Sequence, residues 1–356
     1  MSLWTVKLSP SGGVLRWPKK ESKLEAKLNE LPERFRKAIT KRGVDKIKDS
    51  DCSGYCRKHG VIGIGWSVEP RQDEKEITWE DYYKDYINNG KKEGWLKPRT
   101  INIIKQFHNI EVDDLCWVRD ENDYYYVCKI TGKWKYINNP VNWAMDIVQI
   151  HECKWKKVGN ATQVPAGIVR KLITIGDTVS KVKVDDEKNV DYDKLSEFLF
   201  NSEEGTVQKY VNKFNGTKDV SADFINNLTQ YEYEDLVGFY LQHEYYIMPS
   251  TRTQSTKDYE FVLINKIDYH IAAVQVKAQN KPISAKEYEK KFGSFDKFYL
   301  ACTKGVVDIE NKGKIIEIKN EDLLQFFRDK TDLLPDRIKF MAVYFKEKKV
   351  ESRGKD

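Results

Sequence analysis

The sequence lacks long apolar segments and several common functional motifs. No run of about 18 apolar residues occurs in the 356-residue chain, so we expect no membrane-spanning helix. No glycine-rich loop ends in Gly-Lys-Ser or Gly-Lys-Thr, which argues against nucleotide hydrolysis by the chain itself. Cysteine is sparse, with six residues of which only Cys52 and Cys56 lie close together. This usage predicts reduced thiols rather than a disulfide framework.

Residues 1–17 also lack the apolar core of a signal peptide, so we expect a cytoplasmic protein. Charged residues make up 33% of the chain and the net charge is +6, which predicts a heavily charged surface. A modest positive charge permits a polyanionic partner without requiring one.

Tryptophan is absent from the second half of the sequence. All nine tryptophans lie between Trp4 and Trp155, and this change of composition indicates at least two domains with different roles. Residues 183–190 are polar and charged, as expected of a linker. We therefore predict an aromatic-rich domain at residues 1–182, a linker and helical connector at 183–225, and a further domain at 226–356.

The first domain is predicted to be mostly β-structure, a small barrel or curled sheet with attached helices. Alternating and aromatic-rich segments bounded by turn residues carry this prediction. The expected strands are residues 62–68, 114–120, 124–131, 134–136 and 147–155, and the expected helices are residues 78–86 and 100–107.

The last domain is predicted to be α/β with a mixed sheet, because helical and strand-like patterns alternate along it. Two segments of the connector, residues 192–200 and 224–230, are expected to be helical. In the domain itself, helices are expected at residues 232–243, 284–292 and 321–328, and strands at 259–264, 271–276, 297–303, 314–318 and 339–345.

A set of polar residues lies on or beside the expected helix at 232–243 and the two expected strands that follow it, 259–264 and 271–276. Asp258 and Glu260 are two residues apart, as are Gln275 and Lys277, so each pair shares one face of its predicted strand. Glu234 lies on the preceding helix. Gln275 and Lys277 interrupt an apolar segment, where buried polar groups need partners. A metal ion and its bound water would supply them.

These residue types predict hydrolysis of a phosphodiester with Mg²⁺. Asp258 is the expected main ligand, with Glu260 or Glu234 as second carboxylate and the Gln275 amide oxygen as a neutral ligand. Lys277 would orient the attacking water and stabilise charge on the phosphoryl oxygens. The structural alternative is an edge strand whose Gln275 and Lys277 face solvent while Asp258 lies in a turn.

From residue 231 to about residue 318, the sequence resembles the PD-(D/E)xK nuclease superfamily, in particular its Mrr-like restriction endonuclease branch, which is similar in using Gln-x-Lys. The resemblance implies an active site of Glu234, Asp258, Gln275 and Lys277. The chain departs from the branch in two ways. Ser255, Thr256 and Lys257 stand where glycines are usual, and Glu260 is an additional acid.

The aromatic residues of the first half suggest a pocket that holds an extruded base between rings. We select Trp66, Trp117, Trp134 and Tyr125 for this pocket, with Asp114 as a contact for an exocyclic amine. Tryptophans in small domains mostly fill the core, which is the structural alternative. Basic residues suited to the DNA backbone are Lys129, Lys133, Lys135 and Arg119.

Residues 61–169 resemble the PUA-like fold of the EVE and YTH type. The matching motifs begin at Gly63, Asp114 and Tyr126, and Trp66 closes the first of them. Similar modules precede nuclease domains in modification-dependent restriction enzymes. The resemblance implies a β-barrel that reads a modified base such as methylated or hydroxymethylated cytosine.

The sequence therefore predicts a bacterial or archaeal restriction endonuclease that cuts modified double-stranded DNA with Mg²⁺ in defence against foreign DNA. Cutting both strands requires two active sites, so we expect a homodimer. One alternative is a non-catalytic nucleic-acid-binding protein built on a nuclease-like scaffold. Another is an RNA-directed or repair nuclease with the same core.

Overall fold

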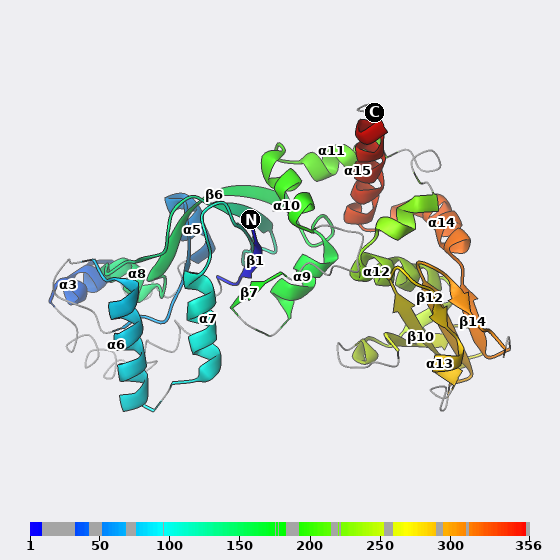
Figure 1. The fold of residues 1–356 in the computed structure, drawn as a ribbon, viewed down its shortest axis with the longest axis horizontal. Helices are drawn as coiled ribbons and strands as arrows, with labels where there is room; N and C mark the ends of the chain where they lie inside the picture. The colour runs from blue at the N-terminus through cyan, green and yellow to red at the C-terminus, as the bar shows by residue number, and fades with distance from the viewer. Residues whose placement is uncertain are drawn as a thin grey trace. The chain divides into compact units, whose positions relative to one another are not determined.

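The chain divides into two compact units (Figure 1). Unit 1 comprises Met1–Ala161, Arg170–Lys183 and Asp193–Glu204, and unit 2 comprises Thr162–Val169, Val184–Tyr192 and Gly205–Asp356. The segment 193–204, which the sequence placed in the connector, is thus grouped with unit 1. The computed structural model describes residues 1–8, 33–42, 52–68, 76–94, 96–174, 176, 178–182, 192–214, 220, 222–252, 259–289, 295–310 and 313–353.

Unit 1 contains a curled, half-barrel sheet with strand order β2-β6-β4-β3-β1-β7, and β5 pairs with β6 outside this path. Only the pair of β1 with β3 is parallel. The predicted pairing of residues 114–120 with 124–131 is confirmed as the antiparallel β3–β4 hairpin. The strands are β1 (Leu3–Val6), β2 (Val61–Ile64), β3 (Leu115–Arg119), β4 (Tyr125–Ile130), β5 (Lys135–Tyr136), β6 (Gln149–Gly159) and β7 (Val179–Lys181).

The β3–β4 hairpin is buried on both faces, which explains its nearly continuous apolar sequence. Cys116 and Val118 belong to a large core cluster on one face. Trp117 points to the opposite face because side chains alternate along a strand, and its indole N–H donates to Ser196 Oγ at 2.9 Å. Ser196 lies on helix α10 (Tyr192–Asn201), so this helix covers the second face.

Three helices of unit 1, α5, α6 and α7, pack on strands of this sheet, and α3 packs on α8. The N-cap of α6 is Thr78, whose hydroxyl accepts from Asp81 N, and Pro98 begins α7. The segments predicted as helices at 78–86 and 100–107 are confirmed within longer helices. The helices are α3 (Glu33–Arg42), α5 (Cys52–His59), α6 (Trp79–Lys92), α7 (Pro98–His108), α8 (Pro140–Ala144), α9 (Ala166–Ile173) and α10 (Tyr192–Asn201); α9 and α10 each have residues in both units.

Unit 2 is built on a mixed five-stranded sheet with order β14-β12-β10-β9-β8. The strands β10, β12 and β14 are parallel to one another, whereas β8, β9 and β10 form antiparallel pairs. The predicted mixed α/β arrangement of this part of the chain is therefore confirmed. The sheet strands are β8 (Tyr245–Ile247), β9 (Phe261–Asn265), β10 (Ile271–Lys277), β12 (Lys297–Cys302) and β14 (Ile315–Ile318), and β11 (Ile283–Ser284) pairs separately with β13 (Val306–Val307).

Helix α12 packs against β10 and α14, which brings its acidic residues beside the central strand. The predicted helix at residues 232–243 is confirmed as α12, and that at 321–328 as α14. The helices of unit 2 are α11 (Thr206–Lys213), η2 (Ala222–Asn227), α12 (Gln230–Leu241), η3 (Pro249–Thr251), α13 (Lys286–Glu289), α14 (Asn320–Asp329), η4 (Thr331–Leu333) and α15 (Asp336–Arg353).

The predicted strand at residues 339–345 is wrong, because this segment lies within helix α15. Its valine and aromatic residues favour strands in isolation. Here Ile338 and all residues from 340 to 344 are buried, so this part of the helix is covered on several sides, and α15 packs along α11. Tertiary packing has overridden local propensity. Of the helix predicted at residues 284–292, residues 286–289 are helical, Ser284 belongs to strand β11 instead, and residues 290–292 lie outside the described residues.

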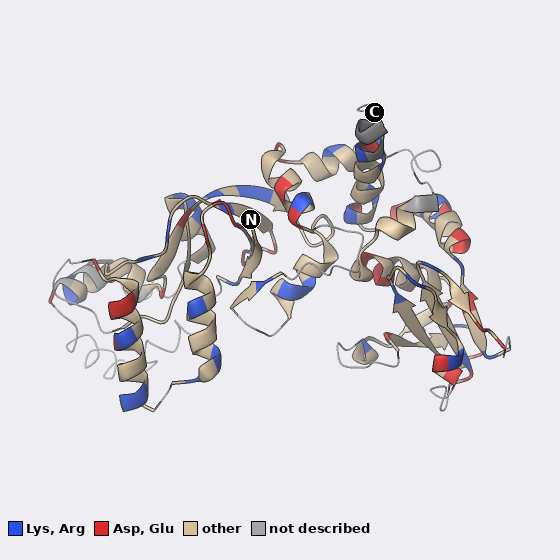
Figure 2. Ribbon diagram, in the orientation of Figure 1, with Lys and Arg blue, Asp and Glu red and all other residues tan. Residues whose placement is uncertain are grey.

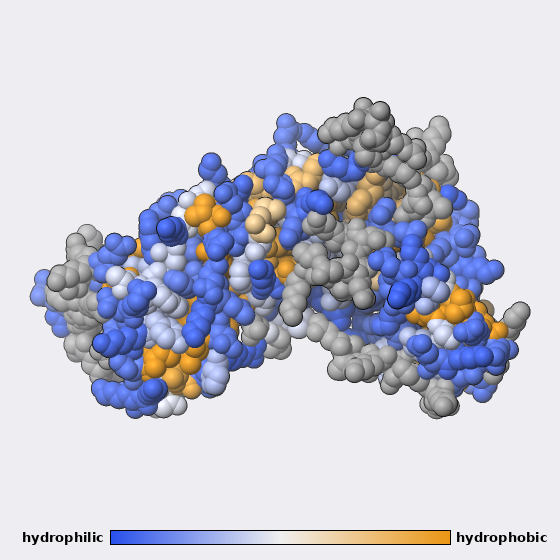
Figure 3. Space-filling model, in the orientation of Figure 1, coloured by the Kyte–Doolittle hydropathy of each residue, from blue (hydrophilic) through white to orange (hydrophobic). Residues whose placement is uncertain are grey.

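The structure bears on two of the expectations drawn from composition. All six cysteines are free, as expected of reduced thiols, and all six are buried. No described helix is long and apolar enough to cross a membrane. Basic and acidic residues are distributed over both units (Figure 2). Apolar atoms on the face shown gather in separate patches divided by hydrophilic surface (Figure 3).

Candidate active site

The β9–β10 hairpin brings Glu260, Gln275 and Lys277 together. Phe261 is paired with Val274, and Glu260 N donates to Val274 O at 2.7 Å, so Glu260 stands next to Gln275 across the two strands. The Gln275 side-chain Nε2 donates to Glu260 Oε1 at 2.9 Å. Lys277 Nζ lies 3.7 Å from the same oxygen. One carboxylate oxygen therefore contacts both residues of the Gln-x-Lys pair.

Burial separates the roles of these three side chains. Gln275 is fully buried, whereas the side chains of Glu260 and Lys277 are 17% and 35% exposed. The Gln275 Oε1 atom has no hydrogen-bond partner among the described residues. An unsatisfied buried acceptor costs roughly 1–3 kcal/mol. The amide oxygen is thus a buried acceptor without a hydrogen bond, next to the partly exposed Lys277.

Glu234 lies on α12 and is buried at 5% exposure. The N-cap of this helix is Thr229, whose hydroxyl accepts from Glu232 N. Gln230 Nε2 donates to Glu234 Oε1 at 2.8 Å and also to Val276 O at 2.8 Å. Gln230 therefore links Glu234 to β10, the strand that carries Gln275 and Lys277. The contacts of Glu260 with Gln275 and Lys277 do not include Glu234.

A second buried acid, Glu232, precedes Glu234 by two residues. Its Oε1 accepts a 2.6 Å hydrogen bond from Ala166 N. Burial raises the pKa of its carboxyl to about 7, and the Ala166 N–H and the charge of Arg337 lower the pKa in part. Glu232 therefore binds backbone within unit 2 rather than joining the Glu260 cluster.

The opposite side of β10 is fixed by β12. Lys277 is in register with Cys302, and Thr303 N donates to Lys277 O at 3.1 Å. The Thr303 hydroxyl donates to Gln279 O and accepts from Gln279 N. The backbone that carries Lys277 is thus held from the β12 side by several hydrogen bonds.

The oxygen atoms of this cluster suit a hard divalent cation such as Mg²⁺, which prefers carboxylate and amide oxygens. Glu260 would supply a carboxylate and Gln275 the unpaired amide oxygen described above. Asp258, the predicted main ligand, lies outside the described residues. Among those that are described, no three His, Cys, Asp or Glu side chains are grouped to hold a metal. A complete ligand set would therefore need Gln275 and further oxygens.

In the first unit, three of the residues selected for the base pocket lie in the core. Trp117 is fully buried against α10, and Tyr125 is 1% exposed. Asp114 is 4% exposed, and its carboxylate accepts from Trp4 Nε1 at 2.9 Å and from Ser2 N at 2.6 Å. Trp117 and Asp114 therefore have hydrogen-bond partners in the core, and Tyr125 is packed there; their part in a ligand pocket stays a prediction.

Replacing Trp117 by phenylalanine should reduce the free energy of unfolding of unit 1 by about 1–3 kcal/mol, because the bond to Ser196 and part of the buried ring area are lost. Urea denaturation followed by tryptophan fluorescence measures this, since all the tryptophans lie between Trp4 and Trp155. Any preference for modified DNA should be unchanged. If the variant lost a preference for modified DNA while its stability was unchanged, Trp117 would be assigned to the base pocket.

Trp66 and Trp134 are only partly buried and belong to one polar network. The Trp134 indole N–H donates to Gln149 Oε1 at 3.3 Å, and Gln149 Nε2 donates to Gly65 O and to Tyr82 Oη. Tyr82 in turn donates to Trp66 O at 2.9 Å. This chain of bonds fixes the 65–66 backbone, in which Trp66 adopts a left-handed φ of 60°.

Gly65 permits this arrangement because a Cβ atom there would stand 2.2 Å from Asp146 Oδ2. A larger residue at position 65 would therefore require the Asp146 carboxylate to move. The sequence predicted a strand through residues 62–68, but β2 ends at Ile64 and the turn follows.

An aromatic cluster that the sequence analysis missed surrounds Trp134. Trp79 stacks on His108 with ring centroids 3.8 Å apart, and Trp134 stands edge-on to Trp79 at 5.4 Å. Tyr83 stacks on Trp79 at 5.4 Å. The signal available was the i, i+4 spacing of Trp79 and Tyr83 on a predicted helix. Trp134 thus lies within a group of rings from α6 and α7.

The basic residues selected for the DNA backbone lie on or beside β3, β4 and β5. Lys133 is exposed. Lys129 forms an ion pair with Asp113 at 3.1 Å, Lys135 with Glu152 at 2.6 Å, and Arg119 with Asp123. Such exposed pairs contribute little to stability. These residues stay candidates for backbone contact.

Comparison with protein-family models, with curated proteins and with solved structures gave no match for this chain.

Proposed function

We propose that the protein is a Mg²⁺-dependent endodeoxyribonuclease whose active site contains Glu260, Gln275 and Lys277. One observation carries the proposal: the β9–β10 pairing places a carboxylate, an amide oxygen without a partner and an ammonium group around one point at the end of the sheet. A purely structural edge strand would turn Gln275 to solvent, whereas this residue is fully buried.

The residues have distinct roles in this proposal. Bound Mg²⁺ would polarise the phosphoryl group and lower the pKa of a water molecule. Glu260 and Gln275 would hold the ion together with Asp258, and Glu234 would stand behind them on α12. Lys277, with its partly exposed ammonium group, would orient the attacking water and stabilise negative charge on the phosphoryl oxygens. The arrangement supports the PD-(D/E)xK and Mrr-like resemblance of this half of the sequence.

Unit 1 is proposed to be a PUA-like reader of a modified base, such as methylated or hydroxymethylated cytosine. Its curled sheet and the partly buried Trp66 and Trp134 support this proposal. Double-stranded DNA is the proposed partner, and a homodimer would bring two active sites to the two strands.

The test is the cleavage of supercoiled plasmid DNA that carries modified cytosine. With Mg²⁺ we expect nicked and then linear plasmid, and with EDTA we expect neither. An intact plasmid at every Mg²⁺ and Mn²⁺ concentration, under conditions in which the protein binds the DNA, would refute the nuclease function and favour the non-catalytic alternative.

Replacing Trp66 by alanine should reduce the preference for modified over unmodified duplex by about 10-fold, since stacking on one aromatic ring contributes roughly 1–3 kcal/mol. Affinity for unmodified duplex should change little, because phosphate contacts dominate it. The measurement is fluorescence anisotropy with both duplexes at one salt concentration.

The matched control is Trp155→Ala, a second partly buried tryptophan of the same unit, whose indole N–H donates to Val61 O. It should leave the preference intact. An unchanged preference in the Trp66 variant would exclude Trp66 from the reader pocket.

A further inference from the structure

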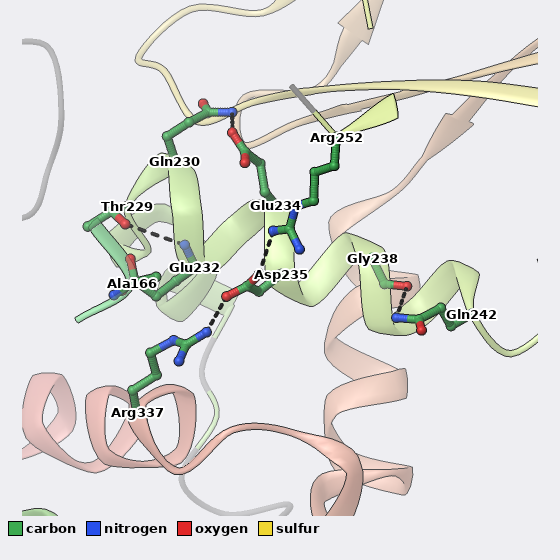
Figure 4. A network of polar contacts seen from close by, with 10 residues as sticks. All are labelled: Ala166, Thr229, Gln230, Glu232, Glu234, Asp235, Gly238, Gln242, Arg252 and Arg337. Atoms are coloured by element: carbon green, nitrogen blue, oxygen red, sulfur yellow. Dashed lines mark hydrogen bonds and ion pairs between the residues drawn. The ribbon is translucent and has the colours of Figure 1, made fainter. Parts of the chain in front are cut away.

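Gln230 occupies a bridging position that the candidate site does not account for. Its side-chain amide makes three hydrogen bonds: Nε2 donates to Glu234 Oε1 and to Val276 O, each at 2.8 Å, and Oε1 accepts from Ala278 N at 2.7 Å. Both amide hydrogens and the carbonyl oxygen are therefore used. Figure 4 shows Gln230 and Glu234 extending from the same side of α12 toward each other.

The two backbone contacts lie on either side of Lys277. The backbone groups of alternate strand residues point to the same side, and Val274 O faces β9, where it accepts from Glu260 N. Val276 O and Ala278 N therefore point to the same side of β10 as Val274 O. Both groups lie further along β10 than the residues that pair with β9, which begins at Phe261. The Gln230 amide thus bonds to these two backbone groups as a neighbouring strand would.

Lys277 is consequently held from both edges of β10. Its carbonyl accepts from Thr303 N on the β12 side, and the residues before and after it bond to Gln230 on the other side. The same amide holds Glu234. One side chain thus fixes the position of an acid on the helix relative to the lysine on the strand.

We propose that Gln230 is a positioning residue of the active site, which aligns Lys277 and Glu234 for phosphodiester hydrolysis. The inference rests on the proposed nuclease function for its catalytic part. It rests on geometry alone for its structural part, namely that the amide restrains the backbone at residues 276–278.

The rest of α12 is anchored without Gln230, which separates positioning from folding. Asp235 binds Arg252 Nη2 at 2.8 Å and also pairs with Arg337 (Figure 4). Tyr233 Oη donates to Asn320 Oδ1 at 3.0 Å, and Leu236 and Val237 are fully buried. The helix should therefore stay in place when only the amide group of Gln230 is removed.

The test is the Gln230→Met variant, which keeps the length of the side chain but removes all three hydrogen bonds. Under single-turnover conditions we expect a roughly 10- to 100-fold lower maximal cleavage rate with Mg²⁺, because misplacement of catalytic groups by about 1 Å has effects of this size. The DNA concentration for half-maximal rate should change by less than about twofold, since Gln230 offers no contact to the DNA backbone in this account.

The matched control is Gln242→Met. Gln242 follows the same helix and is exposed, and its side-chain amide donates to Gly238 O of its own helix (Figure 4). This variant should cleave like the wild type. A merely destabilising change would lower the melting temperature and the active fraction, whereas loss of positioning lowers the rate of fully folded enzyme.

A second measurement is independent of activity. Hydrogen exchange at the Ala278 amide should be faster in Gln230→Met than in the wild type, and unchanged in Gln242→Met. If the wild type cleaves and Gln230→Met cleaves equally fast, the positioning role is overturned. If the wild type fails to cleave, the nuclease proposal fails, and the exchange rate decides the remaining claim: faster exchange supports the restraint of residues 276–278, and unchanged exchange overturns it.

Discussion

The Lys277→Ala variant is expected to lose Mg²⁺-dependent cleavage by about 100- to 1,000-fold, the effect of removing one preorganised electrostatic contact to the reacting group. Lys277 is the cation that contacts the Glu260 carboxylate, at 3.7 Å, and its side chain is partly exposed to an incoming phosphate. Removing it takes away the side-chain positive charge that this account assigns to the phosphoryl oxygens, beside that of Mg²⁺. Single-turnover cleavage of a labelled duplex measures the loss.

Two further observations should accompany this result. Affinity for DNA should fall by less than about tenfold, because a single lysine contributes little to the total phosphate contact. Stability should be almost unchanged, because a partly exposed ion pair contributes about 0–1 kcal/mol. The control is Lys281→Ala, an exposed lysine four residues further along, which should cleave normally. A Lys277→Ala enzyme with a wild-type rate would remove this residue from the mechanism.

Replacing Glu260 by glutamine should raise the Mg²⁺ concentration for half-maximal cleavage by at least about 10- to 100-fold, the range seen when groups supporting a metal site are lost. The substitution keeps an oxygen that can accept from Gln275 Nε2, now at 2.9 Å, but removes the negative charge. The loss therefore reports on metal binding and not on collapse of the hairpin. A Mg²⁺ titration of the initial cleavage rate gives the value.

The control for this experiment is Glu244→Gln, an exposed acid that follows α12. The Glu234→Gln variant belongs in the same series, because the sequence left open whether Glu234 or Glu260 completes the metal site. A larger shift in Glu260→Gln would assign the second carboxylate to Glu260. An unaltered Mg²⁺ requirement in Glu260→Gln would contradict its role as a ligand.

The hairpin at the centre of the site could be predicted because period-two patterns are local. Gln275 and Lys277 stand two apart within an apolar strand, and the observed antiparallel pairing places both beside Glu260. Asp258 lies outside the described residues, so its position beside Glu260, Gln275 and Lys277 stays a prediction. The part of Gln230 was not predicted, because its backbone contacts at Val276 and Ala278 depend on where β9 begins.

The aromatic half of the chain was harder to predict from sequence. Composition identifies aromatic residues but does not separate core from surface, since strand alternation gives no direction when both faces are covered. Trp117 was therefore selected although α10, more than 70 residues later, buries it. Trp66 and Trp134 are only partly buried. Trp66 lies in the turn after β2, and Trp134 lies against the ring of Trp79 on α6.

The error at residues 339–345 has a similar cause. Valine, tyrosine and phenylalanine favour a strand when only the local sequence is considered. The helix forms because its apolar residues are buried by other elements of unit 2, including α11. Long-range packing of this kind has no signature within the segment itself.

The most direct test of the account compares cleavage of one duplex sequence with unmodified, methylated and hydroxymethylated cytosine, each with Mg²⁺ or EDTA, by the wild type and by Lys277→Ala. We predict cleavage only with Mg²⁺, faster on at least one modified duplex than on the unmodified duplex, and almost none by the variant. Equal cleavage of all three duplexes would contradict the proposed reader. Cleavage in EDTA or by Lys277→Ala, or none by the wild type with Mg²⁺, would contradict the proposed active site.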